Sequence, residues 1–270
     1  MVEIREETSE QNENESSRSN EPRSNTASSQ QRTTVLMDFL KANPTEALCF
    51  LLRQLTVYFA AVYMLTMSNP EYQKTVYFKA FAAAAATNAF RLHQRVRGST
   101  NPTFSREFLQ EVMLEDSAHY LLYSLIFPTS TPVSMALIPI TLYAIWQSLA
   151  FVIKVASLLN YSNNNIIQKL NQFKTAQTEN VLGLIACSEI FLFPIFFAMI
   201  FMGKANIFFP FLYYRFLAMR YISRRNPYTR LTFANMKMSL YQVAASPSCP
   251  AIIQTVIYKS VALIERLSPI

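Results

Sequence analysis

Long uncharged stretches dominate the pattern of this chain, and the longest runs from Ser117 to Ile153. Those 37 residues contain no Asp, Glu, Lys or Arg, and a Pro-Thr-Ser-Thr-Pro turn at 128–132 divides them. One membrane-spanning helix needs about 20 apolar residues. The stretch is too long for one crossing and too short for two. It therefore predicts a lopsided hydrophobic hairpin with a short first arm, 117–127, and a longer second arm, 133–153.

Four further hydrophobic segments cover residues 47–67, 76–90, 181–202 and 205–219. The turn signals Asn69-Pro70 and Gly203 separate the members of these two pairs. Because only helices and closed barrels satisfy their backbone groups in lipid, apolar runs of this length predict helices. The sequence thus predicts an all-α fold, a polytopic membrane protein built from hydrophobic helical hairpins.

The two ends of the chain differ from this hydrophobic middle. Residues 1–33 are rich in Glu, Ser, Asn and Gln and hold very few apolar side chains, so they are predicted to be a disordered acidic tail. Residues 34–222, with a helix from about Thr34, are predicted to form the helical membrane domain. Residues 223–270 form a basic tail with amphipathic helices.

The segment 251–267 within that tail has an apolar stripe at helical spacing. Such a helix lies in the membrane interface or packs on the protein's own membrane body, and both alternatives remain open. The stripe comprises Ile253, Val256, Ile257, Val261, Ile264 and Leu267.

Composition and charge support a membrane partner. The chain of 270 residues is 51% hydrophobic and 15% charged, against about 25% charged in ordinary soluble domains. Its net charge is +7 although the tail 1–33 is acidic, so the membrane part is the basic part. Lys and Arg near membrane segments favour the anionic cytosolic leaflet. Nucleic acid is not the expected partner, because the Arg residues lie beside apolar runs. The candidate contacts to anionic lipid are Arg220, Arg224, Arg225, Arg230 and Lys237.

The basic segments also bear on topology. Residues 91–106, 154–174 and 215–237 carry most of the Lys and Arg outside the tail. All three face the cytosol if the apolar segments between them turn back as three hairpins, which leaves both termini cytosolic. The alternative is three conventional spans with one terminus on the lumenal side.

Catalytic motifs are absent from the sequence. Three Gly residues allow neither a dinucleotide-binding loop nor a P-loop, and no GxSxG motif occurs. The three Cys and two His lack metal-ligand spacing. We expect no enzyme, no cofactor and no metal. Glu189 is the sharpest candidate, because an ionisable group inside a membrane segment faces a partner or a cavity. Its predicted partner is Arg215, in a structural ion pair; ion transport is the alternative.

Several motifs resemble one known family. These motifs are Arg91–Arg95, Leu114–Phe127, Ile185–Leu192, Phe211–Phe216 and Ser223–Tyr228, and the resemblance runs in order from about residue 40 to residue 270. They resemble the transmembrane protein 33 family, also called Krüppel homologue 2. The tail 1–33 and the alanine run 82–86 depart from the family pattern.

The resemblance implies a multi-pass protein of the endoplasmic reticulum membrane and nuclear envelope, and not an enzyme. Family members are associated with reticulon partners, with the shape of the tubular network, with nuclear pore components and with calcium and stress signalling. We therefore expect a membrane-shaping protein or adaptor. A channel or transporter-associated regulator that uses Glu189 is the alternative. Association of this chain with further copies of itself is left open.

Overall fold

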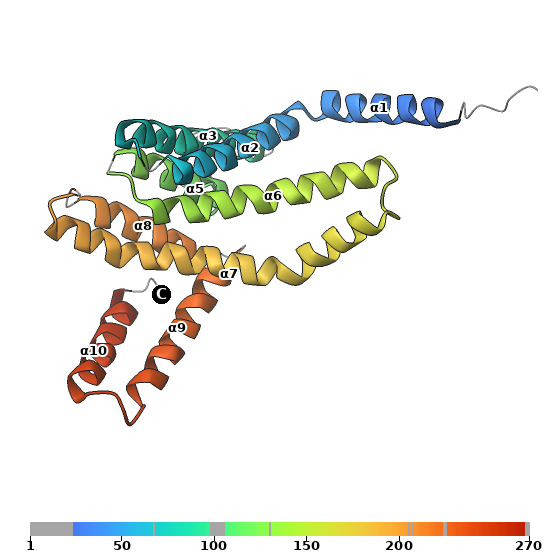
Figure 1. Ribbon diagram of the computed structural model, residues 1–270. Helices are drawn as coiled ribbons and strands as arrows, with labels where there is room; N and C mark the ends of the chain where they lie inside the picture. Colours follow the sequence, from blue (N-terminus) through green and yellow to red (C-terminus); the bar gives the residue numbers. More distant parts are fainter. Residues whose placement is uncertain are drawn as a thin grey trace, which may run out of the picture.

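The computed structural model describes residues 24–66, 68–97, 106–129, 131–204, 206, 208–223 and 226–267. Its regular elements there are all helices (Figure 1), which confirms the all-α class. The α-helices are α1 (Ser24–Ala42), α2 (Pro44–Leu65), α3 (Pro70–Arg97), α4 (Arg106–Met113), α5 (Asp116–Ile126), α6 (Leu137–Leu158), α7 (Asn165–Phe201), α8 (Phe208–Ile222), α9 (Tyr228–Ala244) and α10 (Ala251–Leu267). Two 3-10 turns, η1 (Phe127–Thr129) and η2 (Ser134–Ala136), connect α5 to α6.

Helix starts follow the local sequence. Pro44 and Pro70 are the first residues of α2 and α3, where a missing N–H removes no hydrogen bond. The Asn164 side chain caps α7 by accepting a hydrogen bond of 2.9 Å from the backbone N–H of Ile166. Because of this cap α7 begins at Asn165, well before the predicted apolar segment 181–202, and reaches 37 residues.

Helix α7 ends in a left-handed turn at Gly203. Its φ is 68°, a conformation that glycine adopts without steric cost. The backbone N–H of Lys204 donates to the carbonyl oxygen of Met199 at 2.9 Å, which satisfies one of the free carbonyl groups at the helix end. Asn160, with a φ of 59°, follows the end of α6 in the same way. These turns set the reversals of the chain before and after α7.

The chain reverses direction at the three predicted turns. Helix α2 packs along α3, and α7 packs on α8. Between α5 and α6, the Tyr120 and Tyr143 rings lie 4.8 Å apart, and the Tyr123 hydroxyl donates to the carbonyl oxygen of Ala136 at 2.8 Å. These reversals confirm the predicted helical hairpins, although α5 packs more closely on α3 and α8 than on α6.

Each hairpin pairs one membrane-length apolar helix with one helix of another kind. In the described part of the chain, three helical stretches are long and apolar enough to cross a membrane: Pro44–Leu65, Ser134–Leu158 and Asn165–Phe201. Their partners are α3, which is long but polar, and the short helices α5 and α8, of 11 and 15 residues. The short arm predicted for the middle hairpin thus recurs in the α7–α8 pair, whereas α3 is longer than α2.

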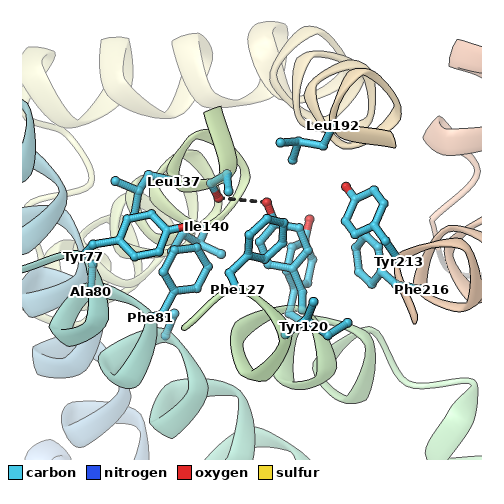
Figure 2. Close-up of a cluster of buried hydrophobic side chains, with 14 of the residues drawn as sticks. Tyr77, Ala80, Phe81, Tyr120, Phe127, Leu137, Ile140, Leu192, Tyr213 and Phe216 are labelled. Atoms are coloured by element: carbon cyan, nitrogen blue, oxygen red, sulfur yellow. Dashed lines mark hydrogen bonds between the residues drawn. The ribbon is translucent and has the colours of Figure 1, made fainter. Parts of the chain in front are cut away.

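An aromatic core joins the hairpins (Figure 2). The Phe81, Tyr123, Phe127 and Tyr213 rings are completely buried, and each comes from α3, α5, η1 or α8. The Phe127 ring lies 5.4 Å from the Phe81 ring and 5.9 Å from the Tyr213 ring. Aromatic pairs at such distances add to the free energy of burial. The core therefore fixes how the short helices α5 and α8 sit on the rest of the bundle.

Three further local features complete the fold. Helix α1 begins at Ser24, so the last ten residues of the tail 1–33 are helical; residues 1–23 lie outside the described residues. Pro139 lies in the first turn of α6, where no interior hydrogen bond is lost. The tail 223–270 does form two helices, and Figure 1 shows α9 and α10 as a pair extending from α7.

Candidate functional site

A buried ion cluster links α5, α7 and α8. Glu189 comes from the apolar part of α7 and Arg220 from the last turns of α8, and both side chains are fully buried. Asp116 and Tyr120 come from the first turns of α5. We call these four residues the Arg220 cluster.

Hydrogen bonds satisfy the charged groups of the Arg220 cluster. The Arg220 Nε donates to Glu189 Oε2 at 3.1 Å, and its Nη1 donates to Asp116 Oδ1 at 3.2 Å. The Tyr120 hydroxyl donates to the second oxygen of Glu189, Oε1, at 2.6 Å. The Arg220 guanidinium also lies 5.0 Å from the centre of the Tyr120 ring, in a cation–π contact. Each carboxylate therefore has a partner from another helix.

The geometry of the Arg220 cluster favours a structural role. A charge buried without a partner costs several kcal/mol, so the cluster holds α5, α7 and α8 in one relative position. The Glu189 side chain has no exposed area, which favours the predicted structural ion pair over a water-filled path. Asp116 is 20% exposed and marks the side from which the cluster meets the surface.

The structure corrects the predicted partner of Glu189. Arg215 is exposed on α8, and Arg220 takes its place. Five residues along an α-helix turn the side chain by about 140°, so Arg215 and Arg220 face different sides of α8. Arg220 is missed as a partner because it follows the apolar part of its segment. A signal was present: Tyr213 and Phe216 continue to Arg220 at helical spacing, and all three are buried.

The same finding removes Arg220 from the candidate lipid contacts, since its side chain is buried inside the protein. Arg224 and Arg225 lie outside the described residues. Arg230 is exposed on α9. Lys237 is partly exposed, and it pairs with Glu265 of α10. This contact raises the pKa of Lys237. Lipid contact by Arg230 and Lys237 stays a prediction.

The predicted stripe on 251–267 is divided by the packing of α10 on α9. Val261 is buried, Ile257 is half-buried, and Gln254 donates a hydrogen bond to the carbonyl oxygen of Ala244 on α9. The other described members of the stripe stay exposed: Ile253, Val256 and Ile264. The side chain of Leu267 lies outside the described residues. One edge of α10 thus docks on the protein and a neighbouring edge is left uncovered, and its place in the membrane interface stays a prediction.

Comparison with known proteins decides the family. The family model described as transmembrane protein 33/nucleoporin POM33 matches residues 28–270. The chain belongs to the transmembrane protein 33 family. A transmembrane protein 33 homolog of Caenorhabditis elegans is 44% identical over 87% of this chain and 85% of that protein. Human transmembrane protein 33 is 37% identical over 86% of this chain and 93% of its own length. Krueppel homolog 2 of Drosophila melanogaster is 34% identical over 87% and 82%.

No solved structure matches this member of the transmembrane protein 33 family. The resemblance seen in the sequence is therefore confirmed as family membership, and with it the coarse assignment to a family of membrane proteins. The motif Leu114–Phe127 contains the whole of α5 and the residues that flank it on either side. The motif Ile185–Leu192 is the part of α7 that carries Glu189. Two motifs that revealed the family thus contribute residues to the Arg220 cluster.

Proposed function

We propose that this chain is a multi-pass protein of the endoplasmic reticulum membrane and nuclear envelope that shapes or regulates the tubular network. It acts there as an adaptor for other membrane proteins. The observation that carries the proposal is the lopsidedness of the α5–α6 and α7–α8 pairs, in which short helices are fixed rigidly beside membrane-length ones.

Helix lengths give the first support. At 1.5 Å per residue, α5 rises about 16 Å and α8 about 22 Å, while the hydrocarbon core of a bilayer is about 30 Å thick. Each short helix therefore occupies only part of the bilayer depth. Helices that add protein volume to one part of that depth spread one leaflet more than the other and favour curvature. From the basic segments of the sequence, we assign the wider side to the cytosolic leaflet.

Rigidity gives the second support. A short helix that tilts or slides freely does not impose a shape on lipid. The Arg220 cluster joins α5 and α8 to α7 through the 3.1 Å and 3.2 Å contacts of one guanidinium. The aromatic core fixes the other ends of the same helices, through Phe127 and Phe209. Each of the short helices α5 and α8 is thus held in place near both of its ends.

The uncovered edge of α10 gives the third support. Ile253, Val256 and Ile264 present an apolar surface, and Lys259 beside them is exposed. An apolar face flanked by basic residues binds the boundary between headgroups and acyl chains. Packing on α9 turns only one edge of α10 away from lipid, so the helix can lie on the membrane while it remains part of the protein.

The adaptor role rests on the family. Its description includes a nucleoporin, which supports nuclear pore components as partners, and the family resemblance adds reticulons. Large apolar side chains lie on the outside of the bundle, among them Leu65 at 83% and Phe201 at 89% exposure. They contact lipid or the helices of such partners.

Reconstitution of the full chain into liposomes of phosphatidylcholine and phosphatidylserine tests the shaping function. Electron microscopy is expected to show tubules with the wild type and fewer with Ile264→Asp, which places a charge on the uncovered edge of α10. Thr255→Asp is the matched control, since Thr255 is exposed on the opposite side of α10 and should leave tubulation unchanged. Spherical liposomes with the wild type at every protein-to-lipid ratio would overturn the proposal.

A further inference from the structure

A basic recess of 330 Å³ lies between the first half of α2 and the last turns of α3 and α6. One acidic side chain, Glu46, lines it together with four cationic ones: Arg53 from α2, Arg91 and Arg95 from α3, and Lys154 from α6. The volume falls at the lower end of the range for small-molecule sites. The recess is separate from the Arg220 cluster, with which it shares no residue.

The positive charge in the basic recess is only partly neutralised. Arg95 pairs with Glu115, and Lys154 pairs with Glu46. Arg91 bonds to the neutral amide of Gln147. Among the residues that the structure describes, no carboxylate lies within ion-pair distance of Arg53 or Arg91. The recess therefore keeps two unmatched positive charges side by side, and these repel each other unless an anion lies between them.

Arg53 is the residue least explained by the protein's own contacts. It lies within Pro44–Leu65, a candidate membrane span, where an ionisable side chain is costly without a partner. Its Nε is buried and makes no hydrogen bond. A buried donor left unsatisfied destabilises the folded state, so a partner from outside the described residues is expected. The planar guanidinium donates two parallel hydrogen bonds to carboxylate or phosphate oxygens.

We propose that the basic recess binds the phosphate headgroup of an anionic membrane lipid, held between Arg53 and Arg91. Lipid is favoured over a soluble phosphate because Arg53 lies within a candidate membrane span, and because Ala150 and Phe151 add apolar side chains to the lining of the recess. Basic pockets between membrane helices recognise lipid headgroups in this way. The proposal stands independently of membrane shaping, since a site for one lipid requires no curvature.

Native mass spectrometry of the detergent-solubilised full chain tests the proposal, with phosphatidic acid as probe. We expect one bound molecule of phosphatidic acid per chain and none of phosphatidylcholine at equal concentration. Arg53→Gln should weaken binding about tenfold or more, because charge-assisted hydrogen bonds are among the strongest in proteins. Arg215→Gln is the matched control: Arg215 is exposed on α8, away from the recess, and its loss should leave binding within about twofold of the wild type.

Further binding experiments identify the ligand. Glycerol phosphate should bind much more weakly than phosphatidic acid; equal binding would overturn the choice of lipid. A peptide of residues 1–23, which carries carboxylates but no phosphate, should not displace the lipid; full displacement would overturn phosphate recognition. Arg91→Gln provides a second variant in case Arg53→Gln fails to fold. Wild-type affinity in a folded variant of either residue would overturn the site itself.

Discussion

Replacing Arg220 with Met is expected to destabilise this protein strongly. Arg220 has no exposed side-chain area, and its guanidinium contacts Glu189 and Asp116 from two other helices. Met fills a similar volume, so the perturbation is mainly the loss of the charge. After the substitution, Glu189 is buried with only the Tyr120 hydroxyl as a side-chain donor.

The size of the effect follows from the burial of the two carboxylates. Removing one partner of a buried ion pair costs about 3–5 kcal/mol, because the other charge is left uncompensated. Glu189 is fully buried and bears the full cost, while Asp116 is 20% exposed and is partly relieved by solvent. We therefore expect a loss of about 4 kcal/mol. For a chain of this size that corresponds to about 8–16 °C in melting temperature.

Thermal unfolding of the purified full chain in a mild detergent measures this loss. Arg215→Met is the matched control, since it makes the same change on an exposed position of the same helix and should shift the melting temperature little. The double variant Glu189→Leu, Arg220→Met should recover much of the loss, because apolar replacements of a whole buried pair are often tolerated. Equal melting temperatures for Arg220→Met and Arg215→Met would refute the structural role of the Arg220 cluster.

Three further predictions use the same assay. Tyr120→Phe removes the hydroxyl that donates to Glu189 and should cost about 2 kcal/mol; an unchanged melting temperature would contradict the 2.6 Å hydrogen bond. Phe81→Ala leaves a cavity at a completely buried position and should lower the free energy of unfolding by about 3–5 kcal/mol. A shift in melting temperature as small as that of a surface substitution would contradict the place of Phe81 in the core. The hydrogen bond that Lys237 donates to Glu265 raises the pKa of Lys237 above its usual 10.5, so this contact stabilises the protein below that pH and is lost as pH rises through the folded value. The difference between wild type and Lys237→Ala should therefore be constant between about pH 6 and 9, and a difference that disappears within that window would refute the pairing.

Much of the fold was predictable because lipid restricts the possibilities. Uncharged runs of about 20 residues must be helical in a membrane, and turn residues between them mark the reversals. Ser117–Ile153 accordingly forms a short helix, a turn and a membrane-length helix. The start of α7 was missed because residues 165–180 are polar, and a single capping contact at Asn164 extends the helix through them.

The partner of Glu189 was less predictable, because it depends on which face of α8 meets α7. The sequence places Arg215 and Arg220 on one short helix and gives both the same charge. Packing of Tyr213 and Phe216 into the core selects the face that carries Arg220. Asp116 and Tyr120 join from α5, far along the chain, and no local spacing reveals such a contact.

The sequence by itself therefore determined the membrane class, the hairpins and the family, since these depend on hydrophobic length and on motifs of neighbouring residues. Only the tertiary structure decided which charges meet. It buried Arg220 against Glu189, divided the stripe of α10 between α9 and open surface, and gathered Arg53, Arg91 and Lys154 around one recess. The physical reason is that hydrophobicity acts on each segment according to its own composition, whereas an ion pair or a binding site requires a definite rotation and depth of helices that are distant in sequence.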